Sequence, residues 1–328
     1  MASPVNSAPH APALDVVTIG EAMMLFIAEQ PGALSQVASF RRATAGAELN
    51  VAVGLSRLGL RVGYISRVGQ DSFGEHLLSF MAHEGIDCQQ VRVDAAHPTG
   101  FMLKSLAGAG ADPQIEYFRK GSAASHMAPQ DAPGAYAAAA RHLHISGICP
   151  ALSKALRELV FELARDARAQ GRSVSFDPNL RPRLWPSQPA MIDCLNQLAR
   201  HADLVLPGLA EGQLLSGRAD AQGIADFYLA RGAKQVIVKL GEQGAYFADG
   251  QSSGIAPAFA VAKMMDTVGA GDGFAVGAIS ALLEGLPLME AARRGNAIGA
   301  RVLQFPGDSD GLPNREQLAQ ALAACAPT

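Results

Sequence analysis

One segment combines two acids with three small residues at a spacing that could support chemistry. It runs from Asp266 to Asp272 as D-T-V-G-A-G-D and precedes an apolar run that we expect to be helical from Asp272. Gly269, Ala270 and Gly271 would let several backbone amides converge at the start of that helix, where the helix dipole also favours anions. A carboxylate there can take a proton from a hydroxyl group that attacks a phosphoryl group. The segment therefore indicates an anion hole beside a general base.

Asp272 also has a plain structural interpretation, as a cap that satisfies the first-turn amides of the helix. Capping requires one aspartate and does not require flanking glycines or a second acid at Asp266, so we favour the catalytic interpretation.

Other nucleotide-binding signatures are absent from the sequence. Gly69 and Gly74 have the spacing of a P-loop, but Glu75 stands where that loop needs lysine, and no G-x-G-x-x-G follows the first strand.

The elements that must position this segment alternate along most of the chain. Short β-rich runs are followed by helical patterns that end at glycine, and we expect an N-cap at Asp71. Strands of this kind separated by helices imply right-handed βαβ units and a parallel sheet covered on both faces. We therefore predict an α/β fold with a doubly wound, mostly parallel sheet. The main expected strands are 16–19, 61–68, 142–146, 174–177, 204–206 and 236–239, and the main expected helices are 47–58, 71–85 and 152–170.

Two stretches interrupt this alternation. Residues from about 22 to 42 and from about 91 to 119 contain short β-like pieces, with glycine and proline between them and no long helix. They predict a small accessory sheet that projects from the main sheet as a lid. We expect a flexible leader at 1–13 and a single domain over 14–328.

Composition excludes several classes of function. The 328 residues carry 27 Lys and Arg against 30 Asp and Glu. The resulting net charge of −3 lacks the excess of positive charge that is typical of nucleic-acid-binding proteins. The longest apolar stretch, 273–283, falls short of the roughly 20 residues that cross a bilayer, so no membrane association is expected. The four cysteines are far apart, which fits a reducing compartment and a cytoplasmic protein. His142 and His144 would share one face of a strand, but no third metal ligand is evident.

The signature segment resembles the C-terminal motif of the ribokinase-like (PfkB) carbohydrate kinases, D-T-x-G-A-G-D. The N-terminal glycine signature of that family is similar to residues 45–52, A-G-A-E-L-N-V-A, with Ala45 where glycine is usual. The resemblance extends from Gly20 to Asp308 and implies ATP-dependent phosphorylation of a sugar hydroxyl. Asp272 would then be the general base, and the amides around Gly269, Ala270 and Gly271 would hold the charge on the moving phosphoryl group.

The resemblance also implies the nucleotide contacts. Glu211 matches an acidic residue that helps to organise Mg²⁺, although Gly208 replaces the asparagine of that element. Gly241 and Gly244 have an alternative interpretation, a hairpin turn, which is compatible with nucleotide contact. The nucleotide-binding residues implied in this way are Asn179, Arg181, Lys239, Gly241, Gly244, Gly269, Gly271 and Asn296.

Two further segments, 115–125 and 176–185, resemble the 2-keto-3-deoxygluconate kinase branch of the family. An acidic sugar needs a fixed cation or a forked donor, and arginine supplies both. The alternative for Arg119 and Arg181 is an ion pair that fastens the lid or steadies the ATP phosphates. The substrate-binding residues implied by the resemblance are Gly46, Ala47, Asn50, Tyr117, Arg119, Arg181, Asp272 and Asp308.

The expected reaction transfers the γ-phosphate of ATP to the 6-hydroxyl of 2-keto-3-deoxygluconate, a step of Entner–Doudoroff or uronate catabolism. ATP and Mg²⁺ are the implied cofactors, a monovalent cation is left open, and the implied assembly is a homodimer through the lid. Two alternatives stay open: a fructokinase or ribokinase acting on a neutral sugar, and a non-catalytic regulator that binds sugar or nucleotide. The contact made by Met102, where some members carry tyrosine, is also left open.

Overall fold

The computed structural model describes residues 14–106, 113–131 and 134–323. The leader predicted at 1–13 lies outside these residues, as does Cys325. Within the described part of the chain, no helix is long and apolar enough to cross a membrane. The other three cysteines, Cys88, Cys149 and Cys194, are free thiols.

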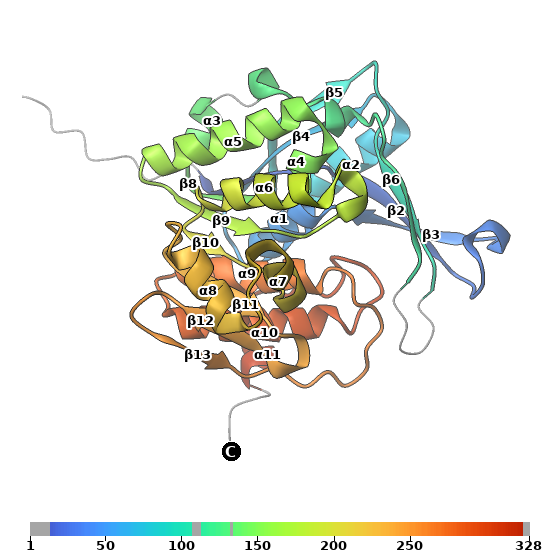
Figure 1. Ribbon diagram of the computed structural model, residues 1–328. Helices are drawn as coiled ribbons and strands as arrows, with labels where there is room; N and C mark the ends of the chain where they lie inside the picture. The colour runs from blue at the N-terminus through green and yellow to red at the C-terminus, as the bar shows by residue number, and fades with distance from the viewer. Residues whose placement is uncertain (1–13, 107–112, 132–133, 324–328) are drawn as a thin grey trace, which may run out of the picture.

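A large twisted sheet forms the centre of the molecule (Figure 1). Its strands are β1 Leu14–Ile19, β4 Val62–Gly69, β5 Asp87–Asp94, β8 Ala140–Ser146, β9 Ser173–Asp177, β10 Leu204–Val205, β11 Gln235–Lys239, β12 Ala245–Ala248 and β13 Ser253–Ala256. Their spatial order is β13-β12-β11-β10-β9-β8-β1-β4-β5. Neighbours from β11 to β5 pair in parallel, and β12 and β13 continue the sheet in antiparallel pairing. This arrangement confirms the predicted mostly parallel sheet.

Helices cover both faces of the large sheet (Figure 1). They are α1 Ala47–Arg57, α2 Ser72–His83, α3 Gly134–Ala138, α4 Cys149–Leu152, α5 Lys154–Ala169, α6 Gln188–Ala199, α7 Leu209–Ser216, α8 Ala221–Leu229, α9 Ala270–Leu283, α10 Leu288–Val302 and α11 Arg315–Ala323. Single 3-10 turns occur at η1 Leu34–Gln36, η2 Ala123–His126, η3 Pro129–Asp131, η4 Pro182–Leu184 and η5 Gly241–Gln243. One hydrophobic cluster is enclosed by α1, α2, α9, α10 and α11, and a second by α4 to α8. Because both faces are buried, the central strands are apolar on both sides.

A small sheet projects from one side of the molecule (Figure 1). It consists of β2 Met23–Ala28, β3 Phe40–Ala45, β6 Phe101–Lys104 and β7 Ile115–Phe118, in the order β3-β2-β6-β7. The small sheet predicted from the two irregular stretches is therefore present. The second stretch, predicted at about 91–119, begins too early, however. Residues 91–94 are the end of β5 and pair with β4 in the large sheet.

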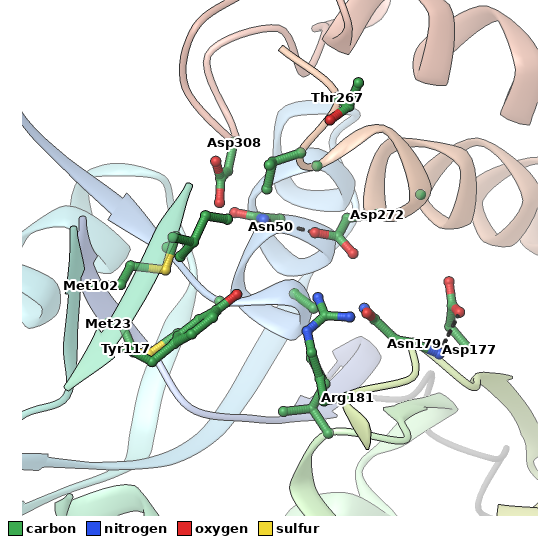
Figure 2. A pocket seen from close by; sticks show the side chains of 18 of the residues that line it. Met23, Asn50, Met102, Tyr117, Asp177, Asn179, Arg181, Thr267, Asp272 and Asp308 are labelled. Atoms are coloured by element: carbon green, nitrogen blue, oxygen red, sulfur yellow. Dashed lines mark hydrogen bonds between the residues drawn. The ribbon is translucent and has the colours of Figure 1, made fainter. Parts of the chain in front are cut away.

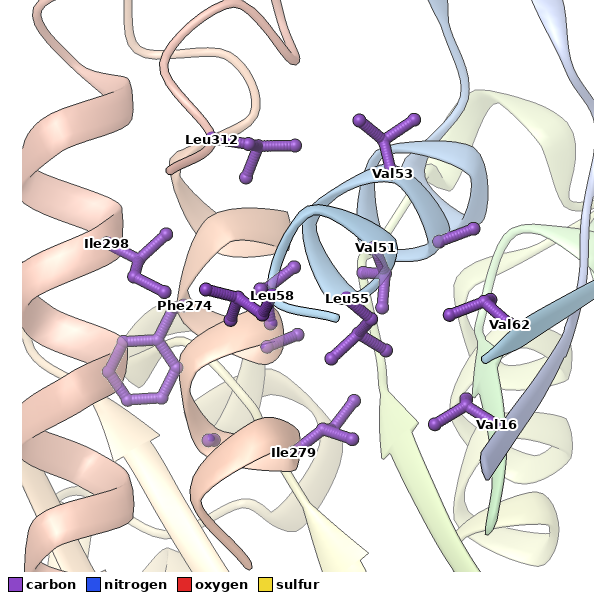
Figure 3. Close-up of a cluster of buried hydrophobic side chains, with 14 of the residues drawn as sticks. Val16, Val51, Val53, Leu55, Leu58, Val62, Phe274, Ile279, Ile298 and Leu312 are labelled. Carbon is purple, nitrogen blue, oxygen red and sulfur yellow. The ribbon is translucent and has the colours of Figure 1, made fainter. Parts of the chain in front are cut away.

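Close packing of α1 against α9 joins the two glycine-containing signatures (Figure 3). Val51 and Leu55 of α1 lie near Ile279 of α9 in one buried cluster. A Cβ atom added at Gly54 would lie 2.5 Å from Cγ2 of Val276, which is far closer than real Cβ contacts. Glycine at this position therefore lets the two helices approach each other. Both helices begin at the same edge of the large sheet, so this contact fixes the distance between their first turns.

Local capping sets the starts of two other helices. The Asp71 side chain accepts a hydrogen bond of 2.8 Å from the Gly74 amide, which confirms the expected N-cap of α2. The helix expected over 152–170 is instead interrupted at Ser153. The Ser153 side chain accepts from the Leu156 amide and caps α5. The interruption separates the short α4 from α5 and turns the chain between them.

Candidate active site

A cavity of about 380 Å³ lies where the carboxyl ends of the parallel strands face the small sheet (Figure 2). The ends of β9 and β11, the first turns of α1 and α9, and the inner face of the small sheet all contribute to its lining. Its volume suits a small polar ligand. Predicted site residues that line it are Gly46, Ala47, Asn50, Tyr117, Arg119, Asn179, Arg181, Glu211, Lys239, Gly269, Gly271, Asp272 and Asp308.

A second cavity, of about 620 Å³, adjoins the first and is more apolar. Phe259, Val261 and Leu303 contribute to its wall. Lys239 and Gly271 line both cavities, so the two compartments meet at the start of α9. Predicted nucleotide contacts that line the second cavity are Lys239, Gly241, Gly244, Gly271 and Asn296, whereas Asn179, Arg181 and Gly269 line only the first.

Asp272 lies inside the first turn of α9 and does not cap it. The helix begins at Ala270, two residues earlier than expected, because Gly269 adopts a left-handed φ of 85° and is itself the N-cap residue. The carboxylate of Asp272 instead accepts a 2.8 Å hydrogen bond from Nδ2 of Asn50 in α1 (Figure 2). The plain capping interpretation is therefore wrong.

Burial raises the pKa of Asp272 to about 8. The hydrogen bond from Asn50 and the charge of Arg181 work in the opposite direction, while the nearby carboxylates of Asp177 and Asp308 raise the pKa further. A carboxylate with a pKa in this range holds its proton more strongly than an ordinary aspartate. Asp272 thus has the properties of a general base that works near neutral pH.

The backbone before Asp272 forms a compact turn that leads into the first amides of α9. Since the first amides of an α-helix have no partner within the helix, those of Ala270 and Gly271 can bind an anion. A Cβ atom at Gly269 would lie 2.5 Å from the carbonyl oxygen of Asp308, so the turn packs directly against a second loop. This contact, together with the positive φ, explains why residue 269 is glycine.

The two arginines that were expected to bind an acid have different surroundings. Arg119 is buried, and its guanidinium group forms an ion pair with Glu21, which also accepts a hydrogen bond from Ser122. In contrast, Arg181 makes no ion pair with any residue that the structure describes, and its Nη1 donates only to the Leu180 carbonyl oxygen. Figure 2 shows Arg181 extending toward Asp272. The ion-pair alternative therefore describes Arg119, and Arg181 is the cation that remains available to a ligand.

The small sheet closes the opposite side of the first cavity. Tyr117, Met102 and Met23 point into it from β7, β6 and β2 (Figure 2). The Arg119 guanidinium lies 5.8 Å from the centre of the Tyr117 ring, so the Glu21 ion pair also steadies the tyrosine. The position of Met102, which the sequence left open, is an apolar contact surface beside Tyr117.

A charged group lies at the junction of the two cavities. Lys239 Nζ donates to Asp177 Oδ2 at 2.7 Å, and although burial opposes its charge, the carboxylates of Asp177 and Glu211 raise the pKa of Lys239. Both oxygens of Glu211 accept backbone amides, from Leu180 and Gly208, each at 2.8 Å. Glu211 therefore holds the loop that carries Asn179 and Arg181.

The wall of the second cavity includes a hairpin. The sequence analysis gave a hairpin turn as the alternative interpretation of Gly241 and Gly244. The chain turns at η5 between β11 and β12, and Gly244 has a φ of 90° there. A Cβ atom at Gly244 would lie 2.1 Å from the carbonyl oxygen of Ala256. Asn296 of α10 donates to the carbonyl oxygens of Ala256 and Pro257 at 3.0 and 2.9 Å. Asn296 thus orders the loop that lines the cavity.

His142 and His144 belong to the core rather than to a metal site. Both rings bond to Ser175, and His142 also bonds to Ser173. Burial lowers the pKa of His142 to about 4 and that of His144 to about 3, so both rings are neutral. Among the described residues, no group of three or more potential ligands could hold a metal ion.

Three charged residues in or beside the site were not predicted from the sequence. Asp177 is the last residue of β9, and a polar residue at the carboxyl end of a parallel strand is a usable signal. Glu21 lies two residues after the end of β1, at the same edge of the sheet. Lys104 ends a short strand of the small sheet and forms ion pairs with Asp266 and Asp308. No local pattern identifies Lys104, because its partners lie more than a hundred residues away.

Comparison with known proteins agrees with this geometry. The model of the pfkB family carbohydrate kinases matches residues 13–315. A 2-dehydro-3-deoxygluconokinase of Bacillus subtilis (strain 168) is 49% identical over 312 residues, covering 95% of this chain and 96% of that protein. The crystal structure of a PfkB protein from Polaromonas sp. JS666 is 52% identical, with a TM-score of 0.87 over 94% of this chain and 99% of that one.

A further crystal structure contains bound nucleotide. It is a putative ribokinase II from E. coli in complex with ATP and Mg²⁺, and it is 26% identical with a TM-score of 0.88. The match covers 95% of this chain and 99% of that one. Since the family model covers most of the chain and both signature segments line the cavities described above, the protein belongs to the PfkB family of carbohydrate kinases.

Proposed function

We propose that this protein is an ATP-dependent kinase that phosphorylates 2-keto-3-deoxygluconate, also called 2-dehydro-3-deoxygluconate, at its 6-hydroxyl. The observation that carries the proposal is the 49% identity to a 2-dehydro-3-deoxygluconokinase over 95% of the chain. The product is 2-keto-3-deoxy-6-phosphogluconate. Arg181 lines the first cavity and forms no ion pair with a described residue, which supports an acidic substrate, because a sugar carboxylate needs a fixed cation.

In the proposed reaction, the sugar occupies the first cavity with its 6-hydroxyl against Asp272. The carboxylate of Asp272 would take the hydroxyl proton as the oxygen attacks the γ-phosphorus, and the bond between that phosphorus and the β–γ bridging oxygen would break, so that ADP leaves. Gly46, Ala47, Asn50 and Asp308 would meet the sugar hydroxyls, and Tyr117 and Arg181 would meet its acid end. Arg119 orients Tyr117 rather than binding the carboxylate, since Glu21 already pairs with its guanidinium group.

ATP would lie in the second cavity, with its base against the apolar wall and its phosphates directed toward Lys239 and Gly271. The amides of Ala270 and Gly271 would hold the charge that develops on the transferred group. Because the described residues contain no metal-binding cage, Mg²⁺ would be held chiefly by the phosphates, and Asp177, which lies beside Lys239, would supply a nearby carboxylate. Mg²⁺ would neutralise phosphate charge there. Glu211 acts indirectly, through the loop that it holds.

Four broader features belong to the same proposal. Residues 14–328 form one kinase domain whose small sheet acts as a lid, and the reaction takes place in the cytoplasm. A homodimer through the lid would cover Phe118, which is 47% exposed on the outer face of β7. A monovalent cation is an additional requirement to be tested by replacing K⁺ with tetramethylammonium in the assay. Sedimentation of the wild type and of Phe118→Lys tests the dimer.

The test of the proposed function is ADP release with Mg-ATP across a panel of sugars. The panel contains 2-keto-3-deoxygluconate, its galactonate epimer, fructose and ribose. Asp272→Asn is the matched control, because it keeps the shape of the side chain and removes its basicity. Preference for the first sugar, lost in the control, supports the proposal. Preference for fructose or ribose, or equal activity of the Asp272→Asn variant, contradicts it.

A further inference from the structure

A buried lysine connects the small sheet to the loops around the start of α9. Lys104, the last residue of β6, is only 1% exposed. Its Nζ forms an ion pair with Asp308 Oδ1 at 2.8 Å and a second ion pair with Asp266. A buried ammonium group is costly unless it is paired, so the position of Lys104 depends on both carboxylates.

Each of these carboxylates is tied to the backbone that forms the anion hole. Asp266 Oδ1 accepts a hydrogen bond of 3.0 Å from the amide of Val268, one residue before Gly269. The backbone of Asp308 packs against Gly269 so closely that no Cβ atom fits between them. Lys104 is therefore the point at which the small sheet meets both supports of the turn.

We propose that Lys104 is a positioning residue that couples the small sheet to the anion hole. Its ammonium group holds Asp266 and Asp308 together, so the amides of Ala270 and Gly271 are correctly placed only when β6 lies over the sugar cavity. Movement of β6 away from the cavity would release both supports at once. The inference rests on the proposed kinase activity and adds a link between lid position and phosphoryl transfer.

The burial of Lys104 also has a purely structural explanation, in which the ion pairs only hold the small sheet in place. The two explanations differ in what a diffusible cation can restore. If the ammonium group positions the anion hole, a small amine that donates hydrogen bonds to Asp266 and Asp308 should recover turnover without being attached to β6. If the ion pairs only hold the small sheet in place, a free amine should not recover turnover, because it is not covalently attached to β6.

The experiment compares Lys104→Ala with and without ethylammonium. We expect kcat to fall by about 100-fold, the loss that a displacement of about 1 Å produces in a catalytic group. The KM for ATP should change little, because Lys104 lines neither cavity. Ethylammonium should restore at least about a tenth of the lost kcat, and tetramethylammonium, which has no N–H donor, should restore none. Lys234→Ala is the matched control, since Lys234 pairs with Asp203 at 2.9 Å but is exposed.

Several results would overturn the inference. These are a kcat within twofold of the wild type, equal rescue by both amines, or a change confined to KM. If Lys104→Ala does not fold, Lys104→Met is used instead, because methionine keeps most of the length of the side chain and removes the ammonium group. The kcat and the melting temperature of this variant are then measured together. Failure of both variants to fold, even with ethylammonium present, would assign Lys104 to the structural role. A wild-type protein that phosphorylates none of the sugars would instead contradict the proposed function, independently of these variants.

Discussion

Replacing Asn50 with alanine should move the pH dependence of turnover to higher pH. Nδ2 of Asn50 donates a 2.8 Å hydrogen bond to the carboxylate of Asp272, and this bond opposes the effect of burial on the pKa. Without the donor, the ionised carboxylate loses a partner and its pKa rises. In the proposed reaction Asp272 must be ionised to accept the hydroxyl proton, so more alkaline conditions are then needed to reach full activity.

The size of the shift follows from the hydrogen bond. A hydrogen bond to a charged group contributes about 1.5–3 kcal/mol, and about 1.4 kcal/mol corresponds to one pKa unit. The pKa of Asp272, about 8 in the wild type, should therefore rise by about 1 to 2 units. At pH 7 the ionised fraction falls from roughly one tenth to between roughly one hundredth and one thousandth, so kcat/KM should fall by about 10- to 100-fold.

The assay is kcat/KM for the sugar, measured by ADP release between about pH 6 and pH 10. The loss should shrink as the pH rises, because the variant base becomes ionised. Asn196→Ala is the control: Asn196 donates to the Leu215 carbonyl oxygen on the other side of the large sheet and should leave the midpoint unchanged. A loss that stays constant from pH 7 to pH 10 would refute the reasoning, because it would mean that Asn50 only binds sugar.

Three other substitutions test packing, nucleotide binding and substrate charge. Gly54→Ala should lower the free energy of unfolding in urea by about 1–3 kcal/mol, because its Cβ atom would meet Val276; unchanged stability would contradict the close approach of α1 and α9. Gly244→Ala should raise the KM for ATP by roughly 5- to 150-fold, since its φ of 90° and the Ala256 carbonyl oxygen oppose a side chain. Arg181→Gln should raise the KM for the sugar acid by roughly 10- to 150-fold without changing the KM for ATP, and an effect on ATP alone would assign Arg181 to the phosphates.

Local patterns in the sequence were sufficient for much of the fold. Alternation of apolar runs with glycine-terminated helices predicted the parallel sheet, and the cap at Asp71 was correct to the residue. The boundary between the two sheets was not predictable, because residues 91–94 and the strands of the small sheet are all short β-like pieces, and no local pattern says which sheet such a piece joins. Only the pairing of β5 with β4 assigns these residues to the large sheet.

The candidate site was predictable where its residues are close together in the chain. The turn at Gly269–Gly271 and the carboxylate of Asp272 come from one segment, so spacing alone indicated the anion hole. The ion pair of Arg119 with Glu21 joins residues 98 positions apart, and that of Lys104 with Asp308 joins residues 204 positions apart. Which carboxylate a buried cation finds depends on the tertiary fold, and no local rule contains that information.

The shared wall of the two cavities has a stereochemical consequence. Lys239 and Gly271 line both compartments, so in the proposed complex a hydroxyl group in one would face a terminal phosphate in the other with no protein group required between them. Such an arrangement favours a ternary complex and a single displacement at phosphorus. A γ-phosphate made chiral with sulfur and oxygen isotopes should then be transferred with inversion of configuration, whereas two successive transfers through the protein would give retention.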